Sequence, residues 1–278
     1  MRIVVKTSLA WILASCIALS CWSAAAAQGK RKVIIDQDAM GPATTDQQAI
    51  LLVLQAPDVE TLGITVVTGD QWRDEEVAHT LRMLELTGYT SIPVVPGAVL
   101  PLINTKEETS RREKLYGSVP YQGAWNWGPQ HPADEVPPLK EGMPSLKPAQ
   151  EDAAHFIVRM VHTYPHEVSI LTGGPLTNIA LAIALDPEVP SLAKELVFNG
   201  GRINPQGIPY EKQNYGTLEF NLWFDPEASH IVLRAPWKAI TCSPVDVTNK
   251  VMDDGEDAYR AYREREFAGA TACGEIRS

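Results

Sequence analysis

Three aspartates in the first quarter of the chain have the residue types and the spacing of a metal site. Asp36 and Asp38 flank a single residue at the end of an apolar, β-branched run, and Asp46 follows a turn rich in Gly, Pro and Thr. Buried carboxylates repel one another unless a cation or hydrogen-bond donors compensate their charge. Oxygen-only clusters suit a hard cation such as calcium. Asp46 also has a simpler alternative role, because Asp is a common cap at a helix N-terminus.

The elements that must position these aspartates alternate between strand and helix patterns. Residues 32–35 predict a buried strand, and residues 46–55 carry apolar side chains at helical spacing. Further strands are predicted at residues 59–67, 92–95, 168–171, 195–198 and 239–242. Further helices are predicted at residues 75–87, 107–116, 151–163, 175–184, 225–233 and 258–267. This alternation predicts an α/β fold with an open, mostly parallel sheet and helices on both faces.

Several polar residues fall at the carboxyl ends of the predicted strands. In a parallel α/β sheet, ligands bind beyond those ends. The polar residues there include Asp70, the pair Gly173 and Gly174, Asn199 and Asp246. Together with the acidic turn they form a convergent set, which predicts one binding site at this edge of the sheet.

Residues 101–150 interrupt the alternation with a segment rich in proline and aromatic residues, including Trp125 and Trp127. The segment is too aromatic for an ordinary disordered linker. Two interpretations are open: a surface insertion that packs against the body, or a flap over a binding cleft.

Four short motifs resemble those of the inosine-uridine preferring nucleoside hydrolase family. Residues 36–46 resemble its Asp-x-Asp-x-Gly-x-Asp-Asp turn, and residues 62–70 resemble its second strand, which usually ends in Gly-Asn. Residues 172–180 resemble its Thr-Gly-Pro-Leu-Thr-Asn segment. Residues 219–221 and 225–228 match Glu-Phe-Asn and Asp-Pro-Glu-Ala. The order of the motifs and their strand context favour membership and imply a Rossmann-like nucleoside hydrolase fold.

The resemblance implies one calcium ion at the bottom of the pocket. Asp38, Asp46 and the main-chain carbonyl of Gly173 would be its ligands, with Asp36 supporting them. The residues implied on the substrate side are Thr45, Asp70, Asn199, Asn214, Glu219 and Asn221. Glu219 has an alternative role as a loop carboxylate in a surface ion pair.

The activity implied by the resemblance is hydrolysis of the N-glycosidic bond of purine or pyrimidine ribonucleosides. Calcium would position a water molecule and lower its pKa, and Asp38 would accept the proton as general base. The ribose would pass through an oxocarbenium-like state, which nearby carboxylates favour. The implied partner is therefore a small-molecule nucleoside.

The sequence departs from the family pattern in two places. Thr45 stands where the first of the paired aspartates is usual, and a downstream His-Asp-Pro element would lie beyond Ser278. Asp246 lies upstream of that element and does not match it, and His131 is the one histidine considered as a substitute acid. We therefore expect a C-terminally shortened member that hydrolyses nucleosides poorly or not at all. A non-catalytic nucleoside- or ribose-binding relative and a calcium-stabilised structural relative are the alternatives.

The first 27 residues have the order of a secretory signal: basic residues, an apolar run and then small residues before Gln28. We expect cleavage after Ala27, an exported (periplasmic or secreted) protein, and one nucleoside hydrolase-like domain over residues 28–278. The less favoured alternatives are a lipid anchor at Cys16 and a retained membrane anchor, since the apolar run is at the lower limit for a span.

Composition excludes one broad class of partner. The 24 Lys and Arg against 34 Asp and Glu give a formal net charge of -10, which disfavours a nucleic-acid surface. No stable membrane span is expected after signal removal. The sequence leaves open whether the protein is a homo-oligomer and whether Cys242 pairs with Cys273.

Overall fold

A computed structural model of the chain describes residues 29–42, 44–119, 121–126, 128–203 and 218–248. Their six strands form a single sheet in the order β3-β2-β1-β4-β5-β6, with every pair parallel. The strands are β1 (Arg31–Gln37), β2 (Val59–Val66), β3 (Val94–Pro96), β4 (Val168–Thr172), β5 (Glu195–Asn199) and β6 (Ile240–Ser243). The predicted α/β class is confirmed, and the strand order reverses between β1 and β4, where such sheets bind ligands.

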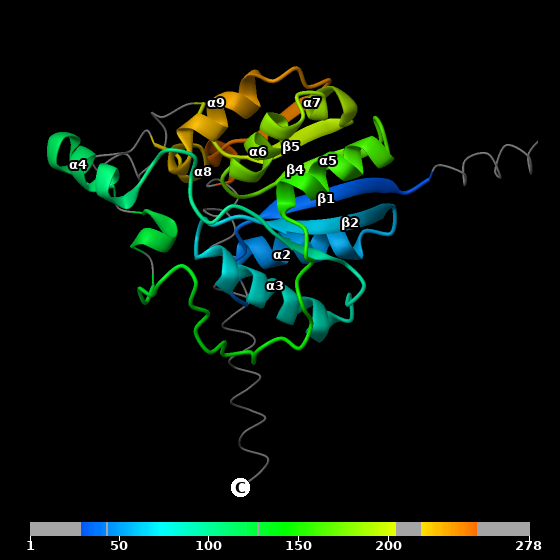
Figure 1. The fold of residues 1–278 in the computed structure, drawn as a ribbon, viewed down its shortest axis with the longest axis horizontal. Coiled ribbons are helices and arrows are strands. Elements are labelled where there is room, and N and C mark those ends of the chain that lie inside the picture. The colour runs from blue at the N-terminus through cyan, green and yellow to red at the C-terminus, as the bar shows by residue number, and fades with distance from the viewer. Residues whose placement is uncertain (1–28, 43, 120, 127, 204–217, 249–278) are drawn as a thin grey trace, which may run out of the picture.

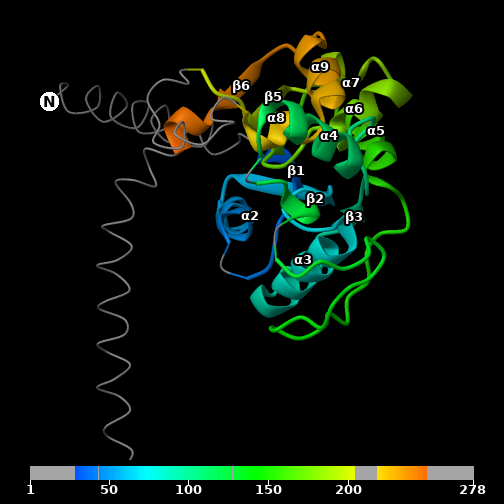
Figure 2. The same cartoon turned by 90° about the vertical axis from the view of Figure 1, so that its left-hand side faces the viewer.

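Helices cover both faces of the sheet. They are α2 (Thr45–Gln55), α3 (Arg73–Thr87), α4 (Lys106–Tyr116), α5 (Ala153–Thr163), α6 (Thr177–Leu185), α7 (Val189–Leu192), α8 (Phe220–Phe224) and α9 (Pro226–Arg234). Figure 1 shows α2 and α3 on one face, with α5, α6 and α9 on the other, and Figure 2 shows the same layers from the side. The short helices α7 and α8 were not predicted, because four or five residues are too few to establish a helical period. The helix predicted at residues 258–267 lies outside the described residues.

Strand β1 lies between two apolar layers of the core. Ile34 belongs to the core under α5 and α6, together with Phe156 and Ile179. Its neighbours Val33 and Ile35 belong to the core under α2 and α3. Successive side chains of a strand point to opposite faces, so burial on both sides explains why β1 is an unbroken apolar run. The carboxyl end of β1, where the aspartates begin, is thereby fixed between two packed layers.

The excursion over residues 101–150 packs against the body of the protein. Trp125 is only 3% exposed and stacks at a tilt on Phe224, with 4.6 Å between ring centroids. The amide of Ala124 donates to the carbonyl of Gly69 at 2.8 Å. The described residues therefore fit the packed insertion, and they also bring the excursion to the end of β2, where a flap would have to lie. Whether it opens stays a prediction.

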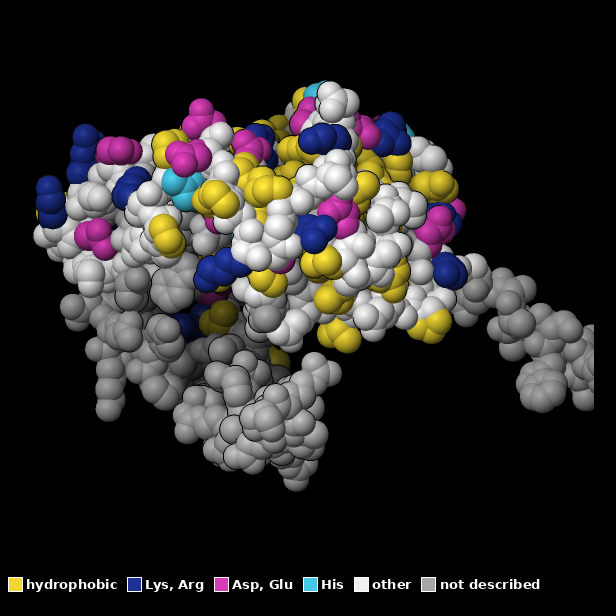
Figure 3. All heavy atoms as spheres, turned by 90° about the horizontal axis from the view of Figure 1, so that it is seen from below, with side chains coloured by type: hydrophobic (Ala, Val, Ile, Leu, Met, Phe, Trp, Pro, Cys, Tyr) yellow, Lys and Arg dark blue, Asp and Glu magenta, His cyan; other side chains and the backbone are white. Residues whose placement is uncertain are grey.

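The molecular surface has no dominant charge on the side drawn in Figure 3, where the described acidic, basic and apolar side chains are interspersed. Within the described part of the chain, none of the helices combines the length and the apolar character needed to cross a bilayer.

Candidate active site

Asp38 lies in a space that two glycines leave open. The residue follows β1 and is 2% exposed. A Cβ atom at Gly69, beyond the end of β2, would lie 2.0 Å from Asp38 Oδ2, and one at Gly174, after β4, would lie 2.7 Å from Oδ1. The backbones that flank Asp38 on both sides must therefore carry no side chain at these positions. The two glycines therefore leave room for a buried carboxylate at the switch point of the sheet, where the strand order reverses between β1 and β4.

Asp36 lies behind this position and is fully buried. Its Oδ1 accepts hydrogen bonds from Thr65 Oγ1 at 2.5 Å and from Asn178 Nδ2 at 2.7 Å. Burial raises the pKa of Asp36 to about 7, although these two donors lower it. Asn178 Oδ1 in turn accepts from the amide of Ala98 at 2.8 Å. Asp36 thus links β1, β2 and α6 behind the site, and its predicted supporting role stays a prediction.

Two further carboxylates lie close enough to Asp38 to interact with its charge. Gln37 Nε2 donates to Asp46 Oδ1 at 2.7 Å, and the amide of Asp70 donates to Asp38 Oδ2 at 3.2 Å. Burial, followed by the negative charges of Asp70 and Asp46, raises the pKa of Asp38 well above its usual range. Burial and the charge of Asp70 raise the pKa of Asp46 to about 7. The charges of Asp38, Asp46 and Asp70, which come from three separate segments, therefore act on one another.

Glu76 is a fourth carboxylate of this group, and the sequence reasoning missed it. The side chain is fully buried in the first turn of α3, where Oε1 accepts from the amide of Gln71 at 2.8 Å and Oε2 has no partner. Burial and the charge of Asp38 raise its pKa well above the usual range. An acidic first turn is ordinary in a helix. The available signal was spacing, because Glu76 shares one buried stripe with Thr80 and Leu84.

These carboxylates have no cationic partner within the described part of the chain. The ion pairs between described residues involve other acids, such as Glu85 with Arg82 and Asp58 with Arg31. One oxygen each of Asp36 and Glu76 is buried without a partner. Uncompensated buried carboxylates are costly, and an oxygen-only donor set fits a hard divalent cation. The types of donor present therefore fit a hard cation, although no three of these described carboxylates have ligand atoms that all lie within 4.8 Å of one another.

The main-chain carbonyl of Gly173 lies beside the same group. A Cβ atom at Gly173 would lie 1.9 Å from Gln37 Oε1, so Gln37 reaches from Gly173 to Asp46. The carbonyl oxygen of Gly173 accepts a hydrogen bond from Asn221 Nδ2 at 2.6 Å, and the carbonyl of Asn199 accepts from the same amide at 3.0 Å. Asn199 Oδ1 is buried without a partner. Asn221 therefore ties the predicted carbonyl ligand to the end of β5.

Three other residues were predicted to bind the substrate, and their surroundings differ: Glu219, Thr45 and Asn214. The carboxylate of Glu219 caps α8 by accepting from the amides of Gly201, Asn221 and Leu222 at 2.7, 3.0 and 3.1 Å. It therefore does not form the surface ion pair considered as an alternative, at least with any described residue. Thr45 is exposed at the first position of α2, and Asn214 lies outside the described residues.

Two other residues singled out in the sequence have local partners. His131 Nε2 lies 2.9 Å from Glu75 Oε2, so this ring joins the excursion to α3. Asp246 Oδ2 accepts from the amide of Ile203 at 2.7 Å. Cys242 is exposed, while Cys273 lies outside the described residues, so their pairing stays untested.

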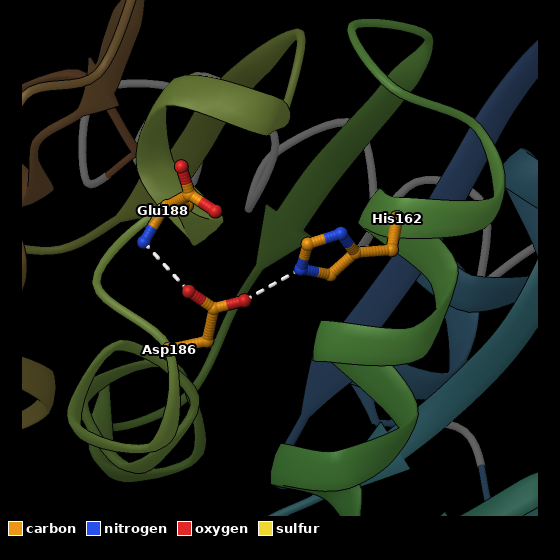
Figure 4. Close-up of side chains that lie close together, drawn as sticks. All are labelled: His162, Asp186 and Glu188. Carbon is orange, nitrogen blue, oxygen red and sulfur yellow. Dashed lines mark hydrogen bonds and ion pairs between the residues drawn. The ribbon is translucent and has the colours of Figure 1, made fainter.

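A second polar cluster lies at the opposite edge of the sheet and is shown in Figure 4. His162, at the end of α5, lies with Nε2 2.6 Å from Asp186 Oδ2, and the amide of Glu188 donates to Asp186 Oδ1 at 2.9 Å. Helix α5 is followed by β4, and α6 is followed by α7 and then β5, so both helices end on the side of the amino ends of the strands. His162 and Glu188 are exposed, and the contacts drawn join the end of α5 to the turn between α6 and α7.

Comparison with known proteins gives relatives of one kind. The chain is 32% identical over 232 residues to uridine nucleosidase 1 of Arabidopsis thaliana, which covers 80% of this chain and 59% of the relative. It is 28% identical over 226 residues to the inosine-uridine preferring nucleoside hydrolase of Leishmania major, covering 80% of this chain and 62% of the relative. The solved structure of an inosine-guanosine nucleoside hydrolase matches with a TM-score of 0.57 at 28% identity, covering 77% of this chain and 60% of that one.

The chain thus spans about three fifths of the length of these relatives. The family model described as inosine-uridine preferring nucleoside hydrolase matches residues 33–275, which is most of the chain. The matched region includes all the carboxylates gathered at the ends of β1 and β2. The chain therefore belongs to the inosine-uridine preferring nucleoside hydrolase family.

Proposed function

We propose that this protein hydrolyses the N-glycosidic bond of ribonucleosides, giving a free base and ribose, with the help of calcium. One observation carries the proposal. Asp38, Asp46 and Asp70 lie close to the point where the strand order reverses, their negative charges act on one another, and no described Lys, Arg or His neutralises them. The family generally uses a metal ion, and a set of oxygen donors favours calcium over softer metals.

Asp38, Asp46 and the carbonyl of Gly173 are the groups that would hold the ion. When bound, it would lower the pKa of a water molecule and orient it. A cation would also offset the mutual repulsion that raises the pKa values of Asp38 and Asp46. At this buried position, a nearby positive charge would therefore favour the ionised form of Asp38.

The chain's own residues account for the remaining steps of the reaction. Asp38 accepts a proton from water while the water oxygen bonds to the anomeric carbon of the ribose. The bond from that carbon to the base nitrogen breaks, and the base leaves with the electron pair and takes up a proton. Asn221 contacts the carbonyls of Gly173 and Asn199, and its amide contacts Glu219, so these three side chains are the candidates for binding ribose hydroxyls. The negative charge of Glu219 would favour the positive charge that develops on the ribose.

The substrate range proposed includes both purine and pyrimidine ribonucleosides. The names of the similar proteins include uridine and inosine among their substrates. Inosine and uridine are therefore the first substrates to test, and the rate ratio between them will give the base preference.

The test is release of free base by the purified protein in millimolar calcium, compared with the same protein in excess chelator. We expect slow turnover, because Thr45 replaces one carboxylate of the family pattern, and we expect chelator to abolish it and Asp38→Asn to lower it by about 10²–10⁴-fold. Asp74→Asn is a matched control, because Asp74 begins the same helix as Glu76 but pairs with Arg73. Calorimetric binding of ribose or inosine without any turnover would instead favour the non-catalytic binding relative.

We also propose that the protein is exported and that its mature form begins near Gln28. The support is the order of basic, apolar and small residues in the first 27 positions. N-terminal sequencing of the protein from extracytoplasmic fractions tests this. An intact Met1 on cytoplasmic protein would refute export, and a lipid on Cys16 would identify the anchor instead.

A further inference from the structure

The side chain of Gln37 connects the start of α2 to the end of β4. Gln37 is the last residue of β1 and is 5% exposed, and its Nε2 donates to Asp46 Oδ1, on the first turn of α2, at 2.7 Å. Successive side chains of a strand point to opposite faces, so Asp36 points towards Asn178 of α6 while Gln37 points towards α2. The strand therefore determines which carboxylate the amide of Gln37 can reach.

Gly173, directly after β4, leaves the space that the amide of Gln37 occupies. A Cβ atom at Gly173 would lie 1.9 Å from Gln37 Oε1 and 2.6 Å from both Cδ and Nε2. Unlike Gly200 and Gly201, Gly173 does not have a positive φ, so a left-handed backbone is not the reason for glycine here. The close approach of Gln37 therefore explains why this position carries no side chain.

Gly173 in turn contacts the residues proposed to bind ribose. Its carbonyl accepts from Asn221 Nδ2 at 2.6 Å, and the backbone amide of Asn221 donates to Glu219 Oε1 at 3.0 Å. A continuous series of contacts thus runs from Asp46 through Gln37 and Gly173 to Asn221. A displacement of Gln37 would change the position of Asp46 relative to the other end of this series.

Glutamine has the chemistry that this position needs. Its amide donates a hydrogen bond without adding charge beside Asp46, whereas a carboxylate there would repel it and an apolar residue would remove the donor. Burial alone does not produce such a contact. Gln47 is also 5% exposed, but its Nε2 is buried without a partner in the described part of the chain. The hydrogen bond to Asp46 is therefore a specific property of Gln37.

We propose that Gln37 is a positioning residue of the candidate site, which holds the carboxylate of Asp46 at a fixed place relative to Gly173. It acts as outer-shell partners of metal ligands do, by fixing the orientation of a group that contacts the ion. The inference rests on the proposed function, because it takes Asp46 to be a group that holds the cation.

The experiment compares Gln37→Met with Gln47→Met, using calorimetric binding of calcium to the whole protein. Methionine is about as long as glutamine but cannot donate a hydrogen bond. We expect Gln37→Met to weaken calcium binding by about 10–100-fold, the loss typical of an outer-shell partner. Gln47→Met is the matched control and should bind within about twofold of the unmodified protein, since its Nε2 has no described partner to lose.

The same titration separates loss of positioning from damage to the fold. A damaged fold would lower the number of calcium sites per chain and leave the affinity of the remaining sites unchanged. Loss of positioning would lower the affinity and leave the number of sites unchanged. In chelator, the unfolding temperature of Gln37→Met should stay within about 4 °C of that of the unmodified protein, since the variant loses one hydrogen bond.

Gly173→Ala tests the contact from the opposite side. The new methyl group meets the far end of the Gln37 side chain, which can turn away from Asp46 at little cost to the fold. We expect calcium binding to weaken about as much as in Gln37→Met. When Gln37→Ala is present in the same chain, the methyl group has room, and Gly173→Ala should weaken binding by no more than about twofold further.

Two outcomes would overturn this inference and leave the proposed function in place. One is calcium binding by Gln37→Met within about threefold of the unmodified protein, while Asp46→Asn loses it. The other is a full additional loss from Gly173→Ala when Gln37→Ala is already present. If the unmodified protein binds no calcium, the proposed cofactor is wrong, and the inference fails with it.

Discussion

The hydroxyl of Tyr121 donates a hydrogen bond to Asp70 Oδ1, although the two residues are 51 positions apart in the sequence. The bond joins the aromatic excursion to the end of β2, where the amide of Ala124 also reaches the carbonyl of Gly69. Burial and the charge of Asp70 raise the pKa of Tyr121, so the phenol stays protonated and remains a donor at any physiological pH. The excursion thus takes part in the candidate site by supporting one of its carboxylates.

The first prediction concerns the proposed general base. Asp38→Asn should lower turnover of inosine and uridine by about 10²–10⁴-fold, the usual contribution of a positioned acid or base. Because the substitution removes one of several buried like charges, we expect the variant to be at least as stable in chelator. Base release and thermal unfolding, measured on the same preparation, check both parts. A variant with unchanged turnover would show that Asp38 is not the base.

The second prediction concerns the glycine that makes room for Asp38. Gly69→Ala places a methyl group 2.0 Å from the position of Asp38 Oδ2, so the carboxylate must move. A displacement of about 1 Å can cost roughly 10²-fold in rate, and we expect a loss of turnover of that order. Gly29→Ala is the matched control, since a Cβ atom there meets nothing within 4 Å. Equal activity of the two variants would contradict the close packing around Asp38.

Periodicity and strand-end position predict the sheet and part of the site. Asp36 and Asp38 follow an apolar run that is buried on both faces, so their place at the sheet edge is a local property of the sequence. The same reasoning applies to Asn199, the last residue of β5, and to Asp70, which lies four residues beyond the end of β2. The chemical roles of these residues were inferred from the resemblance to a family, because their positions alone do not indicate a reaction.

Long-range partners are the part that the sequence does not reveal. Tyr121 lies in a segment with no period, and nothing local says that its hydroxyl meets Asp70. An acid such as Glu76 is common in a first helical turn. Only its helical spacing from the buried Leu84 indicates that it is buried. Thr45 is exposed at the start of α2, and the substrate role that its motif position implies stays a prediction. These contacts depend on tertiary packing, which residue spacing along one element does not encode.

The third prediction separates structural acids from site acids. Asp225 is fully buried and accepts from the amides of Leu102 and Ala228 and from Thr177 Oγ1, at 2.9, 3.0 and 2.7 Å. Asp225→Ala should therefore destabilise the protein by about 3 kcal/mol, the order expected for charged hydrogen bonds at a helix N-terminus. Calcium affinity at a temperature where the variant is folded should be unchanged. Denaturant unfolding and calorimetry test this, and a stable variant that lost calcium would place Asp225 in the metal site.

The last prediction concerns a pair that fastens the excursion to α3. His79 Nδ1 contacts Glu141 Oε1, and His79 Nε2 lies 3.8 Å from Glu75 Oε1. Burial would lower the pKa of His79, but its contacts with the carboxylates of Glu75 and Glu141 outweigh this effect, so the folded-state pKa is raised above 6.5. His131, on the excursion, lies against the other oxygen of Glu75, and its pKa is raised as well.

A histidine with a raised folded-state pKa stabilises the fold fully below its unfolded pKa, and this contribution is lost as pH rises through the folded value. We therefore expect the unfolding temperature to fall between pH 6 and pH 9 by more in the unmodified protein than in His79→Gln. Both proteins contain the acidic site, which also responds to pH. The difference between their two pH profiles therefore reports on His79 and Glu141 alone. His155→Gln is the control, because His155 is exposed and pairs with Asp152 at the start of α5, not with a residue of the excursion. If His79→Gln and His155→Gln show the same pH dependence as the unmodified protein, the ion pair of His79 and Glu141 contributes nothing to holding the excursion in place.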